Sequence, residues 1–360
     1  MTTRMTTIMT ATMLTMMGEE EAMKTIEELE AKLAEPSAAL IRDMAGLDGD
    51  ILLLGVGGKM GPSLARLAVN AIREAGVQKR VIGASRFSDA ELKRELEAGG
   101  VETIAVDLTD DRALQQLPDV RNVIYMAGNK FGTTGNEHFT WAMNAYLPGR
   151  VAEKFKNSRI VVFSTGNVYP LVPVHSGGAT EETPPGPNGE YGMSCLGRER
   201  IFEHFSRKYG IPMVIFRLNY AIDMRYGVLL EIAKAVKERK PIDVTMGHVN
   251  VVWQGDANEW ALRCLKVCNS PPAVFNMSGP ETISLRWVAR EFGRRMGIEP
   301  IIVGEEAPTA LLSNCSKAHR TFGYPRVSLL QMIEWIADWV MAGGVVWNKP
   351  THYQERDGKY

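Results

Sequence analysis

The chain has 360 residues, of which 45% are hydrophobic and 23% charged, and its formal net charge is −1. This length and apolar content suffice for one large core, or for a large core with a smaller one beside it. Charges of both signs are interspersed and no apolar run approaches the roughly 18 residues that span a bilayer, which excludes a nucleic-acid-binding or membrane protein.

The first 17 residues are dominated by Met and Thr, which predicts a disordered tail or a start codon assigned too early. A targeting leader is the weaker alternative, because threonines interrupt the apolar stretch and no convincing cleavage site follows. From Glu19 to Asp43 the apolar spacing becomes helical, and Pro36 divides this segment into two short helices. We therefore expect residues 1–48 to form an N-terminal extension outside the core fold.

An apolar strand is predicted at 51–54, directly before the segment GVGGKMG at 55–61 and a helix with regularly spaced apolar residues. Further strands are predicted, with helical stretches between them, at 80–84, 102–106, 122–127, 159–164 and 212–217. Strands that alternate with helices at this spacing form a parallel sheet covered by helices. We therefore predict an α/β fold, a Rossmann-type doubly wound sheet over residues 49–220.

Beyond Tyr220 the pattern is less regular. Helices are predicted near 228–239, 256–268, 284–296 and 328–342, and short strands near 249 and 273. Asp256, followed by Glu259, has the spacing of a helix N-cap, which we prefer to a role in a site. These segments predict a smaller, substrate-binding lobe over 221–345 and a C-terminal tail over 346–360.

Gly55, Gly58 and Gly61 fall at G-x-x-G-x-x-G, after a predicted strand and at the start of a predicted helix. Glycines there permit a tight turn and close approach of the backbone, and free amides at the helix N-terminus bind a pyrophosphate. A turn that serves only packing is the alternative. The strand before it and the helix after it favour a dinucleotide site.

The second predicted strand ends at Ser85 and Arg86. An acidic residue at this point binds the ribose diol of NAD, whereas an Arg accommodates the 2′-phosphate of NADP. Arg86, with Ser85 and Lys59, therefore favours NADP, with NAD possible; the alternative is that Arg86 is a solvated loop residue. Asp107, after the third strand, either binds the adenine amino group or caps the next helix together with Asp110.

Several further motifs follow the glycine turn in order. They are NVIYMAG at 122–128, FSTGNVYP at 163–170, EETPPGPNGEYGMS at 181–194, FRLNYA at 216–221, VVWQGDA at 251–257 and VFNMSGPETISL at 274–285. Over about residues 49–343 the chain resembles the extended short-chain dehydrogenase/reductase family, which includes NAD(P)-dependent sugar epimerases and dehydratases. The resemblance implies an epimerase, dehydratase or carbonyl reductase that acts on a sugar or sugar-derived substrate and exchanges hydride with a nicotinamide. It also implies a homodimer built through the helices at 137–156 and 191–209.

The resemblance assigns residues to the site. It implies that Tyr191 is the acid/base and that Thr165 holds the reacting substrate oxygen; the alternatives are an aromatic at a helix start and a residue that ends a strand. The residues implied to bind the cofactor are Gly55, Gly58, Lys59, Met60, Gly61, Ser85, Arg86, Asp107, Leu108, Ala127, Gly128, Asn129 and Tyr191. Those implied to contact substrate or its water network are Asn144, His175, Asn219 and Arg217.

One position departs from the family. The family carries Tyr-x-x-x-Lys, in which the ammonium lowers the tyrosine pKa, and this chain has Cys195 at the lysine position. Four explanations stay open. Lys130 supplies the missing cation; Tyr191 works unassisted beside the positive nicotinamide; Cys195 itself acts as an acid/base or redox-sensitive thiol; or catalysis is lost and the protein is an NADP(H)-binding sensor or scaffold.

The four cysteines form no C-x-x-C pair and no metal-ligand spacing. We therefore expect a reduced, cytoplasmic protein without a structural metal. Apart from His175, the histidines have no partner at metal-ligand spacing, so solvated or structural roles are expected for them.

Overall fold

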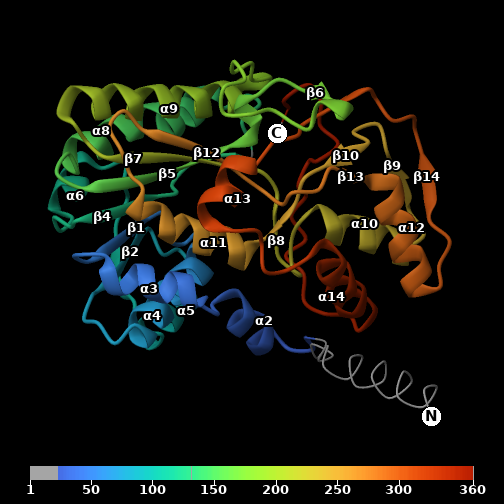
Figure 1. Cartoon of the computed structure of the whole chain (residues 1–360), viewed down its shortest axis with the longest axis horizontal. Coiled ribbons are helices and arrows are strands. Elements are labelled where there is room, and N and C mark those ends of the chain that lie inside the picture. The colour runs from blue at the N-terminus through green and yellow to red at the C-terminus, as the bar shows by residue number, and fades with distance from the viewer. Residues whose placement is uncertain (1–22, 131, 360) are drawn as a thin grey trace, which may run out of the picture.

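The computed structural model describes residues 23–130 and 132–359, and Figure 1 shows their arrangement. The segment 1–17, expected to be a disordered tail, lies outside the described residues. Within the described ranges, no helix combines the length and the apolar character needed to cross a membrane.

A parallel sheet forms the centre of the molecule. In the described part of the chain its seven strands are β1 (Ile51–Leu54), β2 (Val81–Ser85), β3 (Glu102–Ala105), β4 (Asn122–Tyr125), β5 (Arg159–Thr165), β7 (Met213–Leu218) and β12 (Ala273–Met277). They lie in the order β12-β7-β5-β4-β1-β2-β3, and each neighbouring pair is parallel. The predicted Rossmann-type α/β fold is therefore confirmed. The order changes direction between β1 and β4, and such sheets bind ligands in the crevice at that point.

Helices cover both faces of the sheet (Figure 1). They are α4 (Gly61–Glu74), α5 (Ala90–Ala98), α6 (Asp111–Gln116), α7 (Glu137–Trp141), the π-helical turn η1 (Ala142–Tyr146), α8 (Leu147–Lys154), α9 (Gly189–Tyr209) and α11 (Gln254–Arg263). Successive strand residues point to opposite faces. Leu53 of β1 therefore packs with α4 and α11, whereas Leu52 packs with α8 and α9.

The seventh strand comes from a segment that we expected in the smaller lobe. In β12, Val274 pairs with Ile215 of β7, and Phe275 pairs with Phe216. The helix α13 (Ser316–Phe322) also packs on the sheet, and the rings of Phe275 and Phe322 are 5.3 Å apart. Apolar side chains after residue 220 thus complete the core of the main sheet. The domain boundary that we place at residue 220 stays a prediction.

The smaller unit contains α10 (Val228–Lys237), α12 (Leu285–Met296) and α14 (Leu329–Met341). Trp253 and Trp335 meet in its core with ring centroids 5.4 Å apart at 66°. Short strands pair around the core: β8 (Ala221–Ile222) with β11 (Val252–Trp253), β9 (Pro241–Asp243) with β14 (Ile301–Val303), β10 (His248–Val249) with β13 (Ile283–Ser284) and β6 (Val172–Pro173) with β15 (Thr309–Ala310). Short 3-10 turns lie at η2 (Gly166–Val168), η3 (Val174–Ser176) and η4 (Cys264–Lys266).

Residues 23–48, expected outside the core fold, pack against both units. Leu29 and Leu33 of α2 (Ile26–Leu33) join the core of the smaller unit, whereas Leu40 and Met44 of α3 (Ala38–Gly46) join that of the sheet. All four side chains are 0% exposed. Burial of each such side chain is worth about 1.5–3 kcal/mol, which holds the two helices in place. The boundary at residue 48 stays a prediction.

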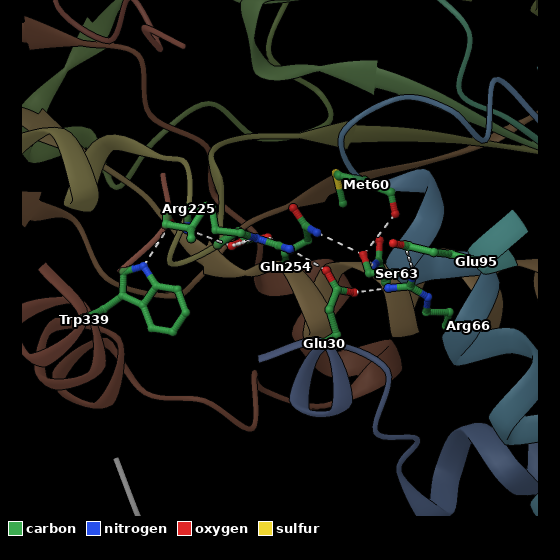
Figure 2. A network of polar contacts seen from close by, with 11 residues as sticks. Glu30, Met60, Ser63, Arg66, Glu95, Arg225, Gln254 and Trp339 are labelled. Atoms are coloured by element: carbon green, nitrogen blue, oxygen red, sulfur yellow. Dashed lines mark hydrogen bonds and ion pairs between the residues drawn. The ribbon is translucent and has the colours of Figure 1, made fainter. Parts of the chain in front are cut away.

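Polar contacts tie α2 and α11 to the start of α4 (Figure 2). Glu30 of α2 accepts hydrogen bonds from Arg66 of α4 and, at 2.5 Å, from Arg225, which follows β8. Gln254 of α11 donates to the Ser63 hydroxyl of α4 at 2.9 Å. One carboxylate of the N-terminal segment therefore joins the sheet unit to the smaller unit.

The helix that carries Asp256 begins earlier than we predicted. It starts at Gln254, so Asp256 is its third residue, and Trp253 precedes it without a side-chain cap. The predicted N-cap role of Asp256 is therefore wrong. Its carboxylate instead accepts a hydrogen bond from the Val327 amide at 3.1 Å, just before α14.

Candidate functional site

At two positions the glycine turn between β1 and α4 leaves room for backbone only. Gly55 has φ +92°, and an added Cβ would lie 2.8 Å from the amide nitrogen of Ala127. A Cβ added to Gly61 would lie 2.1 Å from the carbonyl oxygen of Val56. No side chain caps the start of α4. The Gly61 amide donates to the Gly58 carbonyl at 3.2 Å and Pro62 has no N–H, so α4 offers an anion mainly the positive end of its helix dipole. This cradle, which a side chain would fill, fits the pyrophosphate of a dinucleotide.

Adjoining cavities follow the carboxyl ends of the strands. The β2-side cavity, of about 410 Å³, is lined by Gly55, Gly58, Ser85, Arg86, Asp107, Leu108, Ala127, Gly128 and Asn129, all predicted to bind a cofactor. The central cavity, of about 810 Å³, is lined by the glycine turn together with Lys59 and Met60. The Tyr191 cavity, of about 200 Å³, is lined by Thr165 and Tyr191. Because neighbouring cavities share lining residues, the three adjoin one another.

Arg86 and Asp107 line the same β2-side cavity. Arg86 is exposed at the end of β2. Hydrogen bonds from Thr109, one of them at 2.7 Å, and the charge of Arg86 lower the pKa of Asp107. The N-cap of α6 is Asp110, which accepts from the first amides of that helix at 2.8 and 3.1 Å. Of the two alternatives for Asp107, helix capping is therefore excluded.

Tyr191 and Thr165 line the same cavity, and the Thr165 hydroxyl donates to Asn167 Oδ1 at 3.0 Å. Thr165 is the last residue of β5, Tyr191 lies in the first turn of α9, and Cys195 lies one turn further on. Burial, and next the Cys195 thiol, raise the pKa of Tyr191 well above its ordinary value, against lowering by Arg198 and the Thr165 hydroxyl. At neutral pH the tyrosine is therefore protonated and can donate a proton to an oxygen in the cavity.

Cys195 is 0% exposed, and burial raises the pKa of its thiol. Reactive cysteines are partly exposed and have lowered pKa values. The surroundings of Cys195 are thus those of a small core residue.

A buried guanidinium, that of Arg198, lies near Tyr191. Its Nη1 donates to the carbonyl of Phe163 and its Nη2 to Oδ1 of Asn144, both at 2.8 Å. A Cβ added to Gly128 would lie 2.5 Å from Nη2, so the guanidinium touches the chain just after β4. Our sequence analysis missed Arg198. Its spacing of seven residues from Tyr191 places both on one face of α9, which is a signal that could have revealed it.

Asn144 lies in η1, the π-helical turn between α7 and α8. Its Oδ1 accepts from the amide of Asn129 at 2.8 Å, and its Nδ2 donates to the Asn129 carbonyl at 2.8 Å and to the Ser194 hydroxyl at 3.0 Å. Such π-helical turns are frequent at functional sites. Asn144 is 0% exposed, so its contacts orient Arg198 and the segment after β4 from behind the cavities.

Two lysines line both the central and the Tyr191 cavity. Lys59 Nζ donates to the carbonyl of Ala221 at 2.7 Å and lies 4.3 Å from the ring centroid of Tyr226. Lys130 Nζ lies 5.9 Å from the ring centroid of Tyr191. Burial lowers the pKa of Lys59 to about 7 and that of Lys130 to about 8.

The four residues predicted to contact substrate or its water network lie apart. Asn219 lines the Tyr191 cavity, whereas Asn144 is buried behind it. Arg217 is buried and donates to Glu199 at 2.7 Å. His175 is exposed in η3, outside the lining of the three cavities.

Comparison with known proteins gives a family and a fold. The model of the "NAD dependent epimerase/dehydratase family" matches residues 51–244, more than half of the chain. No curated protein matches.

Among solved structures, the UDP-glucuronic acid 4-epimerase of Bacillus cereus, in complex with UDP-glucuronic acid and NAD, is 20% identical with a TM-score of 0.66. That match covers 81% of this chain and 99% of the other. The UDP-glucose 4-epimerase of Thermus thermophilus, in complex with NAD, is 19% identical with a TM-score of 0.66 over 80% of this chain and 98% of the other. The UDP-glucose 4-epimerase of Thermotoga maritima, with UDP-glucose, is 16% identical with a TM-score of 0.64, over 82% and 99% of the two chains.

At these identities the structures establish the fold. The family match confirms the resemblance found in the sequence and the class of enzyme that it implied. The chain therefore belongs to the NAD dependent epimerase/dehydratase family.

Proposed function

We propose that the protein is a nicotinamide-dinucleotide-dependent enzyme of the epimerase/dehydratase type that acts on a sugar-type hydroxyl or carbonyl through Tyr191. One observation carries the proposal: Tyr191 and Thr165 line a cavity that shares lining residues with the one below the glycine turn. A proton relay and a dinucleotide cradle therefore adjoin each other.

Each of these residues has a distinct task in the proposed reaction. The glycine turn and the N-terminal end of α4 bind the pyrophosphate, and the bound dinucleotide supplies the hydride acceptor or donor. Thr165 orients the reacting oxygen. Tyr191 gives its proton to that oxygen when a carbonyl is reduced and takes the proton back when a hydroxyl is oxidised.

For the missing lysine we propose Arg198 as the cation. Its charge lowers the pKa of Tyr191, and its contact with Gly128 puts it where β4 ends, at the lining of the β2-side cavity. Lys130 remains the alternative, because its ammonium faces the Tyr191 ring. Cys195 is disfavoured as an acid/base by its burial.

The choice of dinucleotide depends on Arg86. Its exposed guanidinium at the end of β2 supports NADP, since an Arg there accommodates a 2′-phosphate. The family description and two of the similar structures name NAD, which supports NAD. Titration of the protein with both dinucleotides separates the two.

We further propose a cytoplasmic homodimer. The four free cysteines agree with a reducing compartment. On the helices expected at the dimer contact, Trp141 is 39% exposed and Tyr146 is 63% exposed. Exposed aromatic side chains gathered on one face are typical of protein interfaces.

The first experiment measures dinucleotide binding and turnover of Tyr191→Phe. We expect dinucleotide binding to persist and turnover to fall about 100- to 10,000-fold, the usual contribution of a general acid or base. Tyr209→Phe, at the exposed end of the same helix, is the matched control and should keep its activity. Retained activity in Tyr191→Phe would refute the role of Tyr191.

The second experiment compares pH–rate profiles of Arg198→Met and Lys130→Met. Removing a positive charge raises the pKa of Tyr191, so the acid limb of alcohol oxidation should move to higher pH in Arg198→Met. Arg198→Lys retains the charge and serves as a folding companion. If the pH–rate profile shifts only in Lys130→Met, Lys130 and not Arg198 is the cation that acts on Tyr191.

The alternative function, a catalytically silent sensor or scaffold, is favoured by the replacement of the family lysine with the buried Cys195. It predicts selective dinucleotide binding with no change in the absorbance of the reduced cofactor when candidate sugars are added. An enzyme would interconvert the two oxidation states.

A further inference from the structure

The Tyr191 cavity has two ammonium groups in its lining, which arrive from different elements. Lys59 belongs to the glycine turn, and Lys130 follows β4. The contacts of Lys59 are with the Ala221 carbonyl and the Tyr226 ring, and the nearby Asp223 carboxylate is engaged by Arg225 at 2.6 Å. The direct contacts of the Lys59 ammonium are thus a neutral acceptor and an aromatic face, and the Asp223 carboxylate acts on it through its charge.

The two lysines also act on each other. The charge of Lys130 lowers the pKa of Lys59, in addition to the larger effect of burial. The charges of nearby carboxylates act in the opposite sense, that of Asp223 on Lys59 and that of Glu231 on Lys130. An anion bound between the two lysines would relieve their repulsion and form charge-assisted hydrogen bonds with each.

We call the described part of the C-terminal tail, residues 346–359, the C-terminal strap, and its Thr351 lines this cavity. Trp347 donates its amide to the Arg225 carbonyl at 3.0 Å, and Thr351 donates its amide to Glu231 at 2.5 Å. The carbonyl of Thr351 accepts from Lys130 at 3.4 Å, and Thr351 lines the cavity.

Beyond the cavity the strap continues to α9, the helix that carries Tyr191. Tyr353 is 2% exposed in the core of the smaller unit, and Arg356 donates to the Thr309 carbonyl at 2.8 Å. Arg356 in turn accepts, through its carbonyl, from Asn188 at the N-cap of α9, at 3.3 Å. The strap ends near β6 (Figure 1), so it runs from the smaller unit to the start of α9.

The size of the cavity limits what can react at Tyr191. Its volume is about 200 Å³. Pockets for larger organic ligands measure roughly 300–1,000 Å³. One sugar ring or a short polyol fits this space. A nucleotide attached to it would have to displace the strap or enter the central cavity.

We propose that the substrate is a free sugar or polyol derivative with one anionic group, held between Lys59 and Lys130, and is not a nucleotide-linked sugar. This proposal rests on the proposed function and specifies its substrate class. The anionic group is a carboxylate or a phosphate monoester, since both accept charge-assisted hydrogen bonds from ammonium groups. The lysines fix one end of the molecule while the reacting oxygen lies at Tyr191.

The test uses the full-length protein in two stages. Dinucleotide binding is first measured alone, because its absence would refute the proposed function before any substrate is added. The dinucleotide-loaded protein is then titrated calorimetrically with glucuronate, glucose 6-phosphate, neutral glucose, UDP and UDP-glucuronate. Binding of glucuronate or glucose 6-phosphate, and not of glucose or UDP, supports the proposal and identifies which anion is used.

Charge variants locate the binding site. We expect Lys59→Met and Lys130→Met each to weaken binding of the preferred anion about 10- to 100-fold, as loss of a charge-assisted hydrogen bond does. The control is Lys234→Met, because Lys234 holds Asn348 of the strap at 2.9 Å and lies outside the lining of the Tyr191 cavity. It should bind the anion as the parent protein does.

Two results would overturn the proposal and leave the proposed function intact. One is tighter binding of UDP-glucuronate than of any free sugar derivative. The other is equal binding of glucose and glucuronate, with no loss in either lysine variant.

Discussion

The buried ion pair between Glu199 and Arg217 ties α9 to the sheet, and Glu199→Gln tests how much stability it provides. The side chains are 4% and 6% exposed, and Glu199 Oε2 lies 2.7 Å from Arg217 Nη2. Glu199 also accepts from the Ser164 hydroxyl at 2.5 Å, directly before Thr165. The pair therefore lies behind the contact between Thr165 and Tyr191.

Gln has nearly the shape of Glu but no charge, so the variant leaves the Arg217 guanidinium buried without a counterion. Removing one partner of a buried pair costs about 3–5 kcal/mol. Arg217 keeps its hydrogen bond to the Tyr169 hydroxyl at 2.5 Å, and Gln still accepts one bond, so we expect a loss near 3 kcal/mol, the lower end of this range. The control is Glu203→Gln, on the same helix, whose pair with Arg207 is 31% and 59% exposed. It should lose only about 0–1 kcal/mol.

The assay is urea unfolding of both variants and the parent protein, followed by circular dichroism under identical ligand conditions. Parallel transitions with a lower midpoint for Glu199→Gln would support the argument. The double variant Glu199→Gln/Arg217→Met, which removes both charges, should recover part of the loss. Equal loss of stability in Glu199→Gln and Glu203→Gln would refute the reasoning, because burial would then make no difference.

Two further changes test the site. Gly61→Ala places a Cβ 2.1 Å from the Val56 carbonyl oxygen, so the turn must shift and dinucleotide affinity should fall at least about tenfold, as measured by titration. Unchanged affinity would show that the turn does not hold the cofactor. Cys195→Ala removes a group that raises the pKa of Tyr191, so the acid limb of alcohol oxidation should move to lower pH. Loss of turnover at every pH would instead make Cys195 catalytic.

Local pattern was enough to predict the main sheet. The runs at 51–54 and 160–163 are apolar along their whole length because both faces of the sheet are covered, and this is visible without a structure. The position in the sheet of the strand near 273 could not be predicted in the same way. Its place beside β7 depends on pairing between residues far apart in the sequence, which no local period encodes.

The functional site likewise contains parts that the local sequence predicts and parts that it does not. The glycine turn and the sequence around Tyr191 predicted the two halves of the site, because their residues are contiguous. Arg198 could have been found from helical spacing alone. The C-terminal strap could not, since it has neither helix nor strand and is held by single contacts such as that of Thr351 with Glu231.

The Glu30 carboxylate bears on how the sheet unit and the smaller unit can move relative to each other. Arg66 and Arg225 lie on opposite sides of the central cavity, and both hold the same side chain. Any rotation that widens the gap between the sheet and the smaller unit must separate Glu30 from one of them. The N-terminal segment therefore holds the two units together beside this cavity, through a residue that precedes the first strand of the sheet.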